Sequence, residues 1–165
     1  MVLGRSGQPS PTRSQRSRVS RRYNRPSDRP ATYAEYGPDD AAWSPDGRWI
    51  AVDSGTHGRS IGIVPARGGG WPAWRKLWDP NDLGGGAESP TWTPDSRHLA
   101  FAVAFSERLF GESGVYAIGI DGRGLRLVVP GGMMPAYSPD GSKIAYVQIS
   151  GVEGGSDIWV SDADG

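Results

Sequence analysis

One eleven-residue segment occurs three times in this chain, and it constrains the fold more than any other feature. The copies are residues 42–52, 91–101 and 136–146, and each contains the sequence Ser/Thr-Pro-Asp-Gly/Ser. Their prolines stand 49 and then 45 residues apart. Spacing of this size is typical of repeat proteins in which each repeat is one supersecondary unit.

The motif predicts a tight turn between two strands. Proline fixes φ near −65° at the second turn position, and Asp and Gly favour the reversal that follows. An aromatic residue ends the strand before each turn. The repeat-defining residues are Trp43, Pro45, Asp46 and Gly47 in the first copy, Trp92, Pro94 and Asp95 in the second, and Tyr137, Pro139, Asp140 and Gly141 in the third.

The residues after each turn predict short antiparallel strands. In residues 98–104, the side chains of Leu99, Phe101 and Val103 share one face, and three alanines share the other. Because both faces are apolar, we expect this strand to be covered on both sides. Third strands are expected over residues 115–120 and 157–160 and fourth strands over 75–78 and 125–129, which predicts four antiparallel strands per repeat.

Composition agrees with many short strands and excludes several kinds of site. The 165 residues include 25 Gly and 14 Pro, which interrupt the chain too often for long helices. There are no cysteines, so disulfides, cysteine-based metal sites and thiol nucleophiles are excluded. No stretch approaches the ~20 apolar residues of a membrane span.

The N-terminal residues differ from the rest of the chain. Residues 1–38 contain eight arginines against two acidic residues, while the remainder is acidic. We expect residues 1–37 to form a disordered Arg/Ser/Pro-rich tail, because so little apolar area does not offset the entropy of ordering it. Residues 1–30 contain one aromatic residue, Tyr23, and no basic face continues from them, so a nucleic-acid partner is not expected.

The unit Trp-Ser-Pro-Asp-Gly-x-x-Ile-Ala, followed by a strand that ends in Asp-Gly, resembles the repeat of TolB-like β-propellers, which are relatives of WD-repeat propellers. The resemblance implies an all-β fold, a partial β-propeller of about three four-stranded antiparallel blades with the last incomplete. The expected blades are residues 38–86, 87–131 and 132–165.

Two departures from this family affect the interpretation. Closed propellers have about four to eight blades, whereas this chain carries three motifs. The chain also reaches Gly165 where the third blade would begin its fourth strand. We therefore expect either a fragment of a longer protein or self-association that completes the propeller.

Three motifs that could indicate chemistry have simpler explanations. Gly58-Arg59-Ser60-Ile61-Gly62 matches a nucleophile elbow, but Ser60 aligns with Gly114 and Asp157 at the start of a strand, and no helix can follow. The two histidines, His57 and His98, are expected to be exposed. Asp162-Ala163-Asp164-Gly165 is explained by a hairpin turn rather than a calcium loop. We therefore expect no catalytic residue, no cofactor and no metal site.

Three tryptophans offer one candidate for partner binding. Trp71, Trp74 and Trp78 have a helical spacing, but nearby glycines and prolines argue against a helix. They either pack between blades or form an exposed aromatic patch for a partner, and both alternatives stay open.

The function expected from these features is that of a non-enzymatic protein-binding or scaffolding module, with a protein or peptide partner. The loops at residues 54–59, 105–113 and 150–156 differ most between repeats and are expected to carry the binding surface. The alternative is the substrate-gating propeller of a prolyl-oligopeptidase-type serine peptidase. The sequence has no signal peptide and reads as cytoplasmic, although relatives are often periplasmic or exported, so its location is not assigned.

Overall fold

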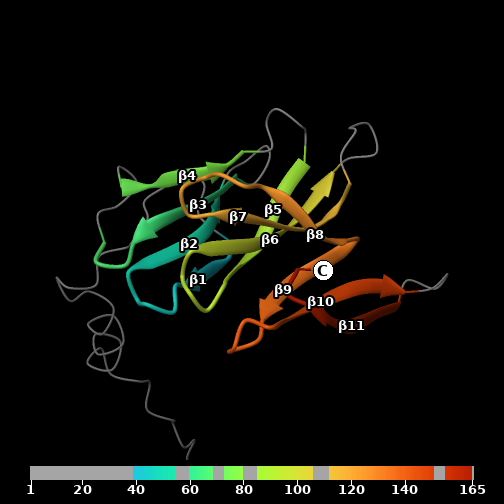
Figure 1. The fold of residues 1–165 in the computed structure, drawn as a ribbon. Coiled ribbons are helices and arrows are strands. Elements are labelled where there is room, and N and C mark those ends of the chain that lie inside the picture. Colours follow the sequence, from blue (N-terminus) through green and yellow to red (C-terminus); the bar gives the residue numbers. More distant parts are fainter. Residues whose placement is uncertain are drawn as a thin grey trace, which may run out of the picture. The chain divides into compact units, whose positions relative to one another are not determined.

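The computed structural model describes residues 39–54, 60–68, 73–79, 85–105, 112–150 and 155–164, all within one compact unit, Ala31–Gly165. These residues form three antiparallel sheets (Figure 1). Sheet 1 is β1 (Ala41–Trp43), β2 (Trp49–Ser54), β3 (Ser60–Pro65) and β4 (Arg75–Trp78). Sheet 2 is β5 (Gly85–Trp92), β6 (His98–Phe105), β7 (Gly114–Gly119) and β8 (Arg126–Pro130). Sheet 3 is β9 (Gly132–Tyr137), β10 (Lys143–Ser150) and β11 (Gly155–Asp162).

Strand order within each sheet follows the sequence, so each strand pairs with the next along the chain. This meander is the arrangement of a propeller blade. Sheets 1 and 2 have four strands, and the described part of sheet 3 has three. The prediction of an all-β partial propeller with an incomplete last blade is therefore confirmed. The predicted tail, residues 1–37, lies outside the described residues.

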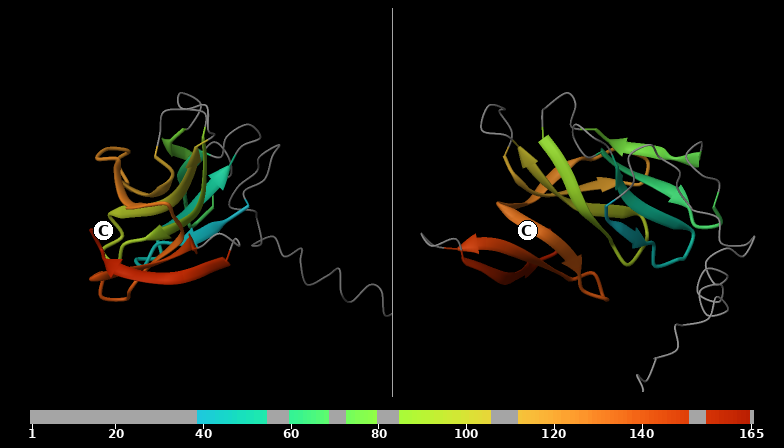
Figure 2. Two further views of the ribbon diagram at one scale, coloured as in Figure 1. Left: turned by 90° about the vertical axis from the view of Figure 1, so that its right-hand side faces the viewer. Right: turned by 180° about the vertical axis from the view of Figure 1, so that it is seen from behind.

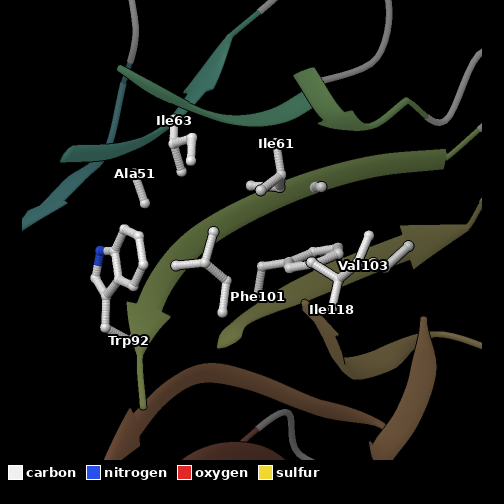
Figure 3. Packing of buried hydrophobic residues seen from close by; sticks show 9 residues of the cluster. Ala51, Ile61, Ile63, Trp92, Phe101, Val103 and Ile118 are labelled. Carbon is white, nitrogen blue, oxygen red and sulfur yellow. The ribbon is translucent and has the colours of Figure 1, made fainter. Parts of the chain in front are cut away.

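The core between sheets 1 and 2 is apolar and closely packed. Phe101 and Val103 of β6 face Ile61 and other buried residues of sheet 1 (Figure 3). Leu99 belongs to the same buried cluster. The Phe101 ring also lies against the Trp78 ring, with 5.6 Å between their centroids.

The other face of sheet 2 is covered by sheet 3. There the buried side chains of Ala100, Ala117 and Val115 pack with Ile144 and Tyr146. The prediction that β6 is covered on both faces is confirmed, except at its end, where Ala104 is exposed.

The three repeat turns have the same hydrogen bonds. In each, the N–H of the fourth turn residue donates to the carbonyl of the first, over 2.9 Å in all three. The fourth residue has positive φ: +69° at Gly47, +58° at Ser96 and +74° at Gly141. This is the geometry of a hairpin whose turn is followed by one left-handed residue.

Side-chain hydrogen bonds also stabilise these turns. The hydroxyls of Ser44, Thr93 and Ser138 each donate to the aspartate two residues later, over 2.6 Å. The same hydroxyls accept the N–H of the residue that begins the next strand, over 2.9, 3.1 and 2.9 Å respectively. Each turn therefore satisfies its own polar groups, and its register with the next strand is fixed.

Ser96 differs from its glycine counterparts because it also joins two sheets. Its hydroxyl accepts the N–H of Asp46, 3.1 Å away in the turn of sheet 1. Beside it, the indole N–H of Trp92 donates to the Ala42 carbonyl over 2.9 Å. Two polar contacts thus accompany the apolar packing of sheet 1 on sheet 2.

We predict that Phe101→Ala lowers the free energy of unfolding by about 3–5 kcal/mol, because the ring is fully buried and its removal leaves a cavity. Urea denaturation followed by tryptophan fluorescence measures this difference. The control is Leu125→Ala at a side chain that is 41% exposed, where we expect a loss below about 1 kcal/mol. Equal losses in the two variants would contradict the assigned core.

We also predict that the turn aspartate makes stability depend on pH. Hydrogen bonds from Ser138 and Ser142 lower the pKa of Asp140 from 3.8 to about 2. Because the folded pKa is the lower one, this contribution to stability is present above about pH 4 and is lost as the pH falls through about 2.

The test compares melting temperatures of the wild type and Asp140→Asn between pH 7 and pH 2. The wild type should be more stable at neutral pH, and the difference should shrink below about pH 4. Asp46 and Asp95 also have lowered pKa values. Because the wild type and the variant share these and the other carboxylates, their effect on the melting temperature cancels in the difference between the two proteins. A difference that stays constant with pH would contradict the prediction.

Candidate functional site

A cavity of about 650 Å³ opens between sheets 2 and 3 at the end where the repeat turns lie. We call it the rim notch. The repeat turns contribute Thr93, Pro94 and Asp95 from sheet 2 and Asp140, Gly141 and Ser142 from sheet 3. The remaining lining residues are His98, Ala117, Arg123, Gly124, Arg126, Tyr137, Asp162, Ala163 and Asp164.

The acidic side chains of the notch are held in the ionised state by local hydrogen bonds. Asp95 accepts from the Thr93 hydroxyl over 2.6 Å and from the N–H of Arg97 over 2.9 Å, and these bonds lower its pKa. A hydrogen bond from the Lys143 ammonium, 2.6 Å away, lowers the pKa of Asp162. Together with Asp140, these carboxylates give the notch fixed negative charge at neutral pH.

The basic side chains come from the hairpin that joins β7 to β8. Within it, the N–H of Gly122 donates to the Gly119 carbonyl over 2.9 Å, and the Asp121 carboxylate accepts the N–H of Arg123 over 3.0 Å. This compact turn places Arg123 in the lining of the notch, as does Arg126 at the start of β8. The notch therefore presents charges of both signs.

Pro94, Ala117 and Tyr137 supply an apolar part of the notch wall. Tyr137 packs at the edge of the core between sheets 2 and 3, and burial raises its pKa. The notch can thus hold a chain segment that has both apolar and charged side chains.

The hydroxyl–carboxylate contacts of the notch have a structural explanation. Ser142 donates to the Asp140 carboxylate over 2.9 Å within one turn. A carboxylate with a pKa of about 2 has little tendency to take a proton at neutral pH, so it would be a weak general base for this hydroxyl. Asp140 instead holds the turn that forms one wall of the notch.

Five of the repeat-defining residues line the notch. They are Pro94, Asp95, Tyr137, Asp140 and Gly141. The equivalent residues of sheet 1 take no part in it. Among these, Trp43 is 63% exposed, whereas its counterpart Trp92 is buried.

Arg123 and Arg126 are notch residues that the sequence pattern does not reveal. Asp121-Gly122 did mark the hairpin that positions them, but an isolated arginine near a turn carries no further signal. Their proximity to Asp95 and Asp140 depends on how sheet 3 packs on sheet 2.

The predicted tryptophan patch is divided between the two faces of sheet 1. Trp78 pairs with Ile61 and packs toward sheet 2 against Phe101. The Trp74 ring lies over Gly62 on the opposite face, 2.5 Å from where a Cβ would stand on that glycine. Trp71 lies outside the described residues. Partner binding by these tryptophans stays a prediction.

Register confirms the alignment that argued against a nucleophile elbow. Ser60 pairs with Ser54 at the start of β3, and its equivalents pair in the same way, Gly114 with Val103 and Asp157 with Gln148. Ser60 is therefore a strand residue in a repeated position. His98 is exposed at the start of β6, as expected, and His57 lies outside the described residues.

Metal-binding clusters and membrane-spanning helices are both absent from the described residues. Among these residues, no three His, Asp or Glu side chains are placed to hold a metal ion together. The described part of the chain also has no helix long and apolar enough to cross a membrane. The central residues of the three variable loops, 55–59, 106–111 and 151–154, lie outside the described residues.

Comparison with known proteins identifies the fold. No family model matches the sequence. Among solved structures, the chain is similar to a putative TolB from Agrobacterium tumefaciens, with 22% identity and a TM-score of 0.60 over 78% of this chain and 43% of that one. It is also similar to TolB from Acinetobacter baumannii, with 20% identity and a TM-score of 0.61 over 80% of this chain and 31% of that one.

A third similar structure is the β-propeller domain of the trilobed protease from Pyrococcus furiosus, with 16% identity and a TM-score of 0.56 over 78% of this chain and 40% of that one. The chain thus spans less than half the length of these three proteins. Fold similarity at this level agrees with the sheet order and the repeat turns described above. The chain therefore has the TolB-like β-propeller fold, of which three blades are described.

Proposed function

We propose that this chain is a non-enzymatic protein-binding module that takes a segment of its partner with both apolar and charged side chains in the rim notch. The observation that carries the proposal is the notch itself. Its volume of about 650 Å³ lies within the usual range of ligand sites, roughly 300–1,000 Å³. It combines an apolar wall with groups of both charges.

Rigidity of the notch walls supports the same proposal. Each wall contains a repeat turn held by the side-chain and backbone hydrogen bonds described above. A site that is already ordered loses little conformational entropy when a partner binds. A flexible peptide can therefore be ordered against walls that do not need to rearrange.

Charge placement suggests what the bound segment contains. Arg123 and Arg126 would pair with an acidic side chain of the partner, while Asp95 and Asp140 would accept from a basic side chain or from backbone N–H groups. Hydrogen bonds to charged groups are stronger than neutral ones and fix the orientation of the segment.

A second candidate function follows from the similarity to the propeller domain of a protease. In that case the propeller would control access to a catalytic domain. Coding sequence after Gly165 that specified a Gly-x-Ser-x-Gly elbow, followed by Asp and His, would favour this alternative over the first.

The first proposal predicts that peptides selected on the wild-type chain depend on the two notch arginines. Peptides from a phage-displayed random library would be selected on the purified chain and their affinities measured by calorimetry. We expect Arg123→Ala/Arg126→Ala to weaken binding at least about tenfold, because each arginine offers a charge-assisted hydrogen bond.

The matched control is Arg48→Ala/Arg97→Ala, which removes the same charge from two repeat turns at positions that do not line the notch. It should leave the affinities within about twofold of the wild type. Equal weakening by both double variants, or a selection that yields no binding peptide, would overturn the proposal.

A further inference from the structure

The two junctions between sheets can be compared position by position, because the three sheets are copies of one repeat. Sheet 2 packs against sheet 1 through one face and against sheet 3 through the other (Figure 2). We call the contact between sheets 1 and 2 the first junction and the contact between sheets 2 and 3 the second junction. The rim notch opens at the second junction. The first junction therefore shows how the same place is arranged when the chain itself bridges it.

One bridge of the first junction is a hydrogen bond between two repeat turns. The Ser96 hydroxyl accepts the N–H of Asp46 over 3.1 Å. This bond joins the fourth residue of the turn in sheet 2 to the third residue of the turn in sheet 1. Its surroundings are closely packed, since Ser96 is 6% exposed and Ser44, the first residue of the sheet 1 turn, is 3% exposed.

A second bridge joins the outer strand of sheet 1 to sheet 2. The Arg75 guanidinium donates to the carbonyl of Ile120 over 2.8 Å. It also lies over the Trp49 ring, with 5.2 Å between the Arg75 Cζ and the ring centroid. In both bridges of the first junction, sheet 1 provides the donor and sheet 2 provides the acceptor.

The second junction has the equivalent donors, in sheet 2. Arg75 pairs with Ile63 in sheet 1. Arg126 pairs with Ala117, which occupies the position of Ile63 in sheet 2. Arg126 is therefore the counterpart of Arg75. Asp95, the third residue of the turn in sheet 2, carries the counterpart of the bridging backbone N–H.

The positions of the two acceptors are also present, in sheet 3. Gly141 is the fourth residue of the repeat turn. Ala163 is the counterpart of Ile120, because the N–H of Ile120 donates to the Arg97 carbonyl and the N–H of Ala163 donates to the Ser142 carbonyl, over 3.0 Å in both. Arg97 and Ser142 follow the fourth residue of their respective turns, so the two bonds are equivalent.

Neither bridge is formed at the second junction. Gly141 has no hydroxyl to accept the N–H of Asp95. Across the described part of the chain, no hydrogen bond joins the Asp95 N–H or the Arg126 guanidinium to sheet 3. All four of these positions, Asp95, Arg126, Gly141 and Ala163, line the rim notch instead. The notch thus presents two donors whose counterparts are paired at the first junction.

We propose that the segment bound in the rim notch contains a serine or threonine whose hydroxyl accepts the N–H of Asp95, and an oxygen that accepts from Arg126. This inference rests on the proposed function and adds the chemistry of the bound segment. The segment takes the places that Ser96 and the Ile120 carbonyl hold at the first junction.

A hydroxyl suits the place beside Asp95 better than a carbonyl does. A carbonyl oxygen only accepts, whereas a hydroxyl accepts one hydrogen bond and donates another. The carboxylates of Asp95 and Asp140 line the notch and can accept that second bond. A hydroxyl would therefore satisfy donors and acceptors of the notch wall together.

Gly141 leaves the Asp95 N–H accessible to a ligand. Its φ is +74°, close to the +58° of Ser96, so the same turn position tolerates a serine in sheet 2. A Cβ on Gly141 would stand 3.1 Å from Cδ of Pro94, the residue before Asp95. A serine at this position would therefore direct its hydroxyl toward the turn of sheet 2 and compete with the bound segment.

The test uses Gly141→Ser and its matched control Gly141→Ala, which adds the same Cβ at the same positive φ without the hydroxyl. Affinities for peptides selected on the wild-type chain would be measured by calorimetry. We expect Gly141→Ser to bind at least about fivefold more weakly than Gly141→Ala, because its hydroxyl takes the Asp95 N–H from the peptide. Equal affinities in the two variants would overturn the inference.

Replacing the hydroxyl residue of the peptide by alanine tests the same bond from the other side. This replacement should weaken binding to the wild type about fivefold and change binding to Gly141→Ser by less than about twofold. Selected peptides that contain neither serine nor threonine, or an equal loss on both proteins, would contradict the inference. The wild-type measurement does not depend on whether Gly141→Ser folds.

Amide hydrogen exchange without peptide separates this inference from the proposed function. The Asp95 N–H should exchange at least about fivefold more slowly in Gly141→Ser than in Gly141→Ala, while the Asp46 N–H serves as an internal reference. An unprotected Asp95 N–H in Gly141→Ser would overturn the equivalence of the two junctions. A wild type that selects no peptide refutes the proposed function. Peptide binding that ignores a protected Asp95 N–H refutes only the inference drawn here.

Discussion

Apolar side chains on both faces of each sheet are the constraint on which this structure depends. A β-strand places alternate residues on opposite faces, and in β6 both sets are buried, Leu99 and Phe101 on one side and Ala100 and Ala102 on the other. A sheet of this composition needs a neighbour on each side. In sheet 2 the Leu99 and Phe101 face meets sheet 1 and the alanine face meets sheet 3, so the series has a direction. At one end of the series, sheet 3 exposes Ile158 and Val160, and at the other, Trp43 of sheet 1 is exposed.

Polar turns complement this packing by fixing where each strand begins. Apolar faces alone would tolerate a shift of two residues along a strand, because such a shift keeps the same side chains on the same face. The hydroxyl–aspartate pair in each turn removes that freedom, since Ser44 and its equivalents bond to the residue that begins the next strand. Two of these turns line the rim notch, so the same hydrogen bonds fix the positions of its lining residues.

The sequence was sufficient to predict the structural elements that repeat, but not the features that depend on contacts between repeats. Three aligned copies predicted the turns, the strand order and the paired positions of Ser60, Gly114 and Asp157. The site depends on long-range contacts instead. Arg123 reaches the same notch as Asp140 only because sheet 3 packs on sheet 2, and no local pattern encodes that approach.

For Trp43 and Ser96 as well, the contacts between repeats could not be predicted from the sequence. Trp43 and Trp92 are equivalent in sequence, yet one is exposed and the other buried, because only Trp92 has a preceding sheet in the described chain. Ser96 stands where the other copies have glycine, and nothing in the motif indicates that it contacts another repeat. In the structure its hydroxyl joins two sheets by accepting the N–H of Asp46.

The residue at this turn position also explains why the two junctions differ. Where sheets 1 and 2 meet, Ser96 bridges the two turns. Where sheets 2 and 3 meet, Gly141 has no side chain to form such a bridge, and its backbone lies close to the Pro94 ring instead. The 650 Å³ notch opens at this second junction. Of the two junctions described, the one whose turn ends in a residue with a hydroxyl is bridged, and the one whose turn ends in glycine opens into the notch.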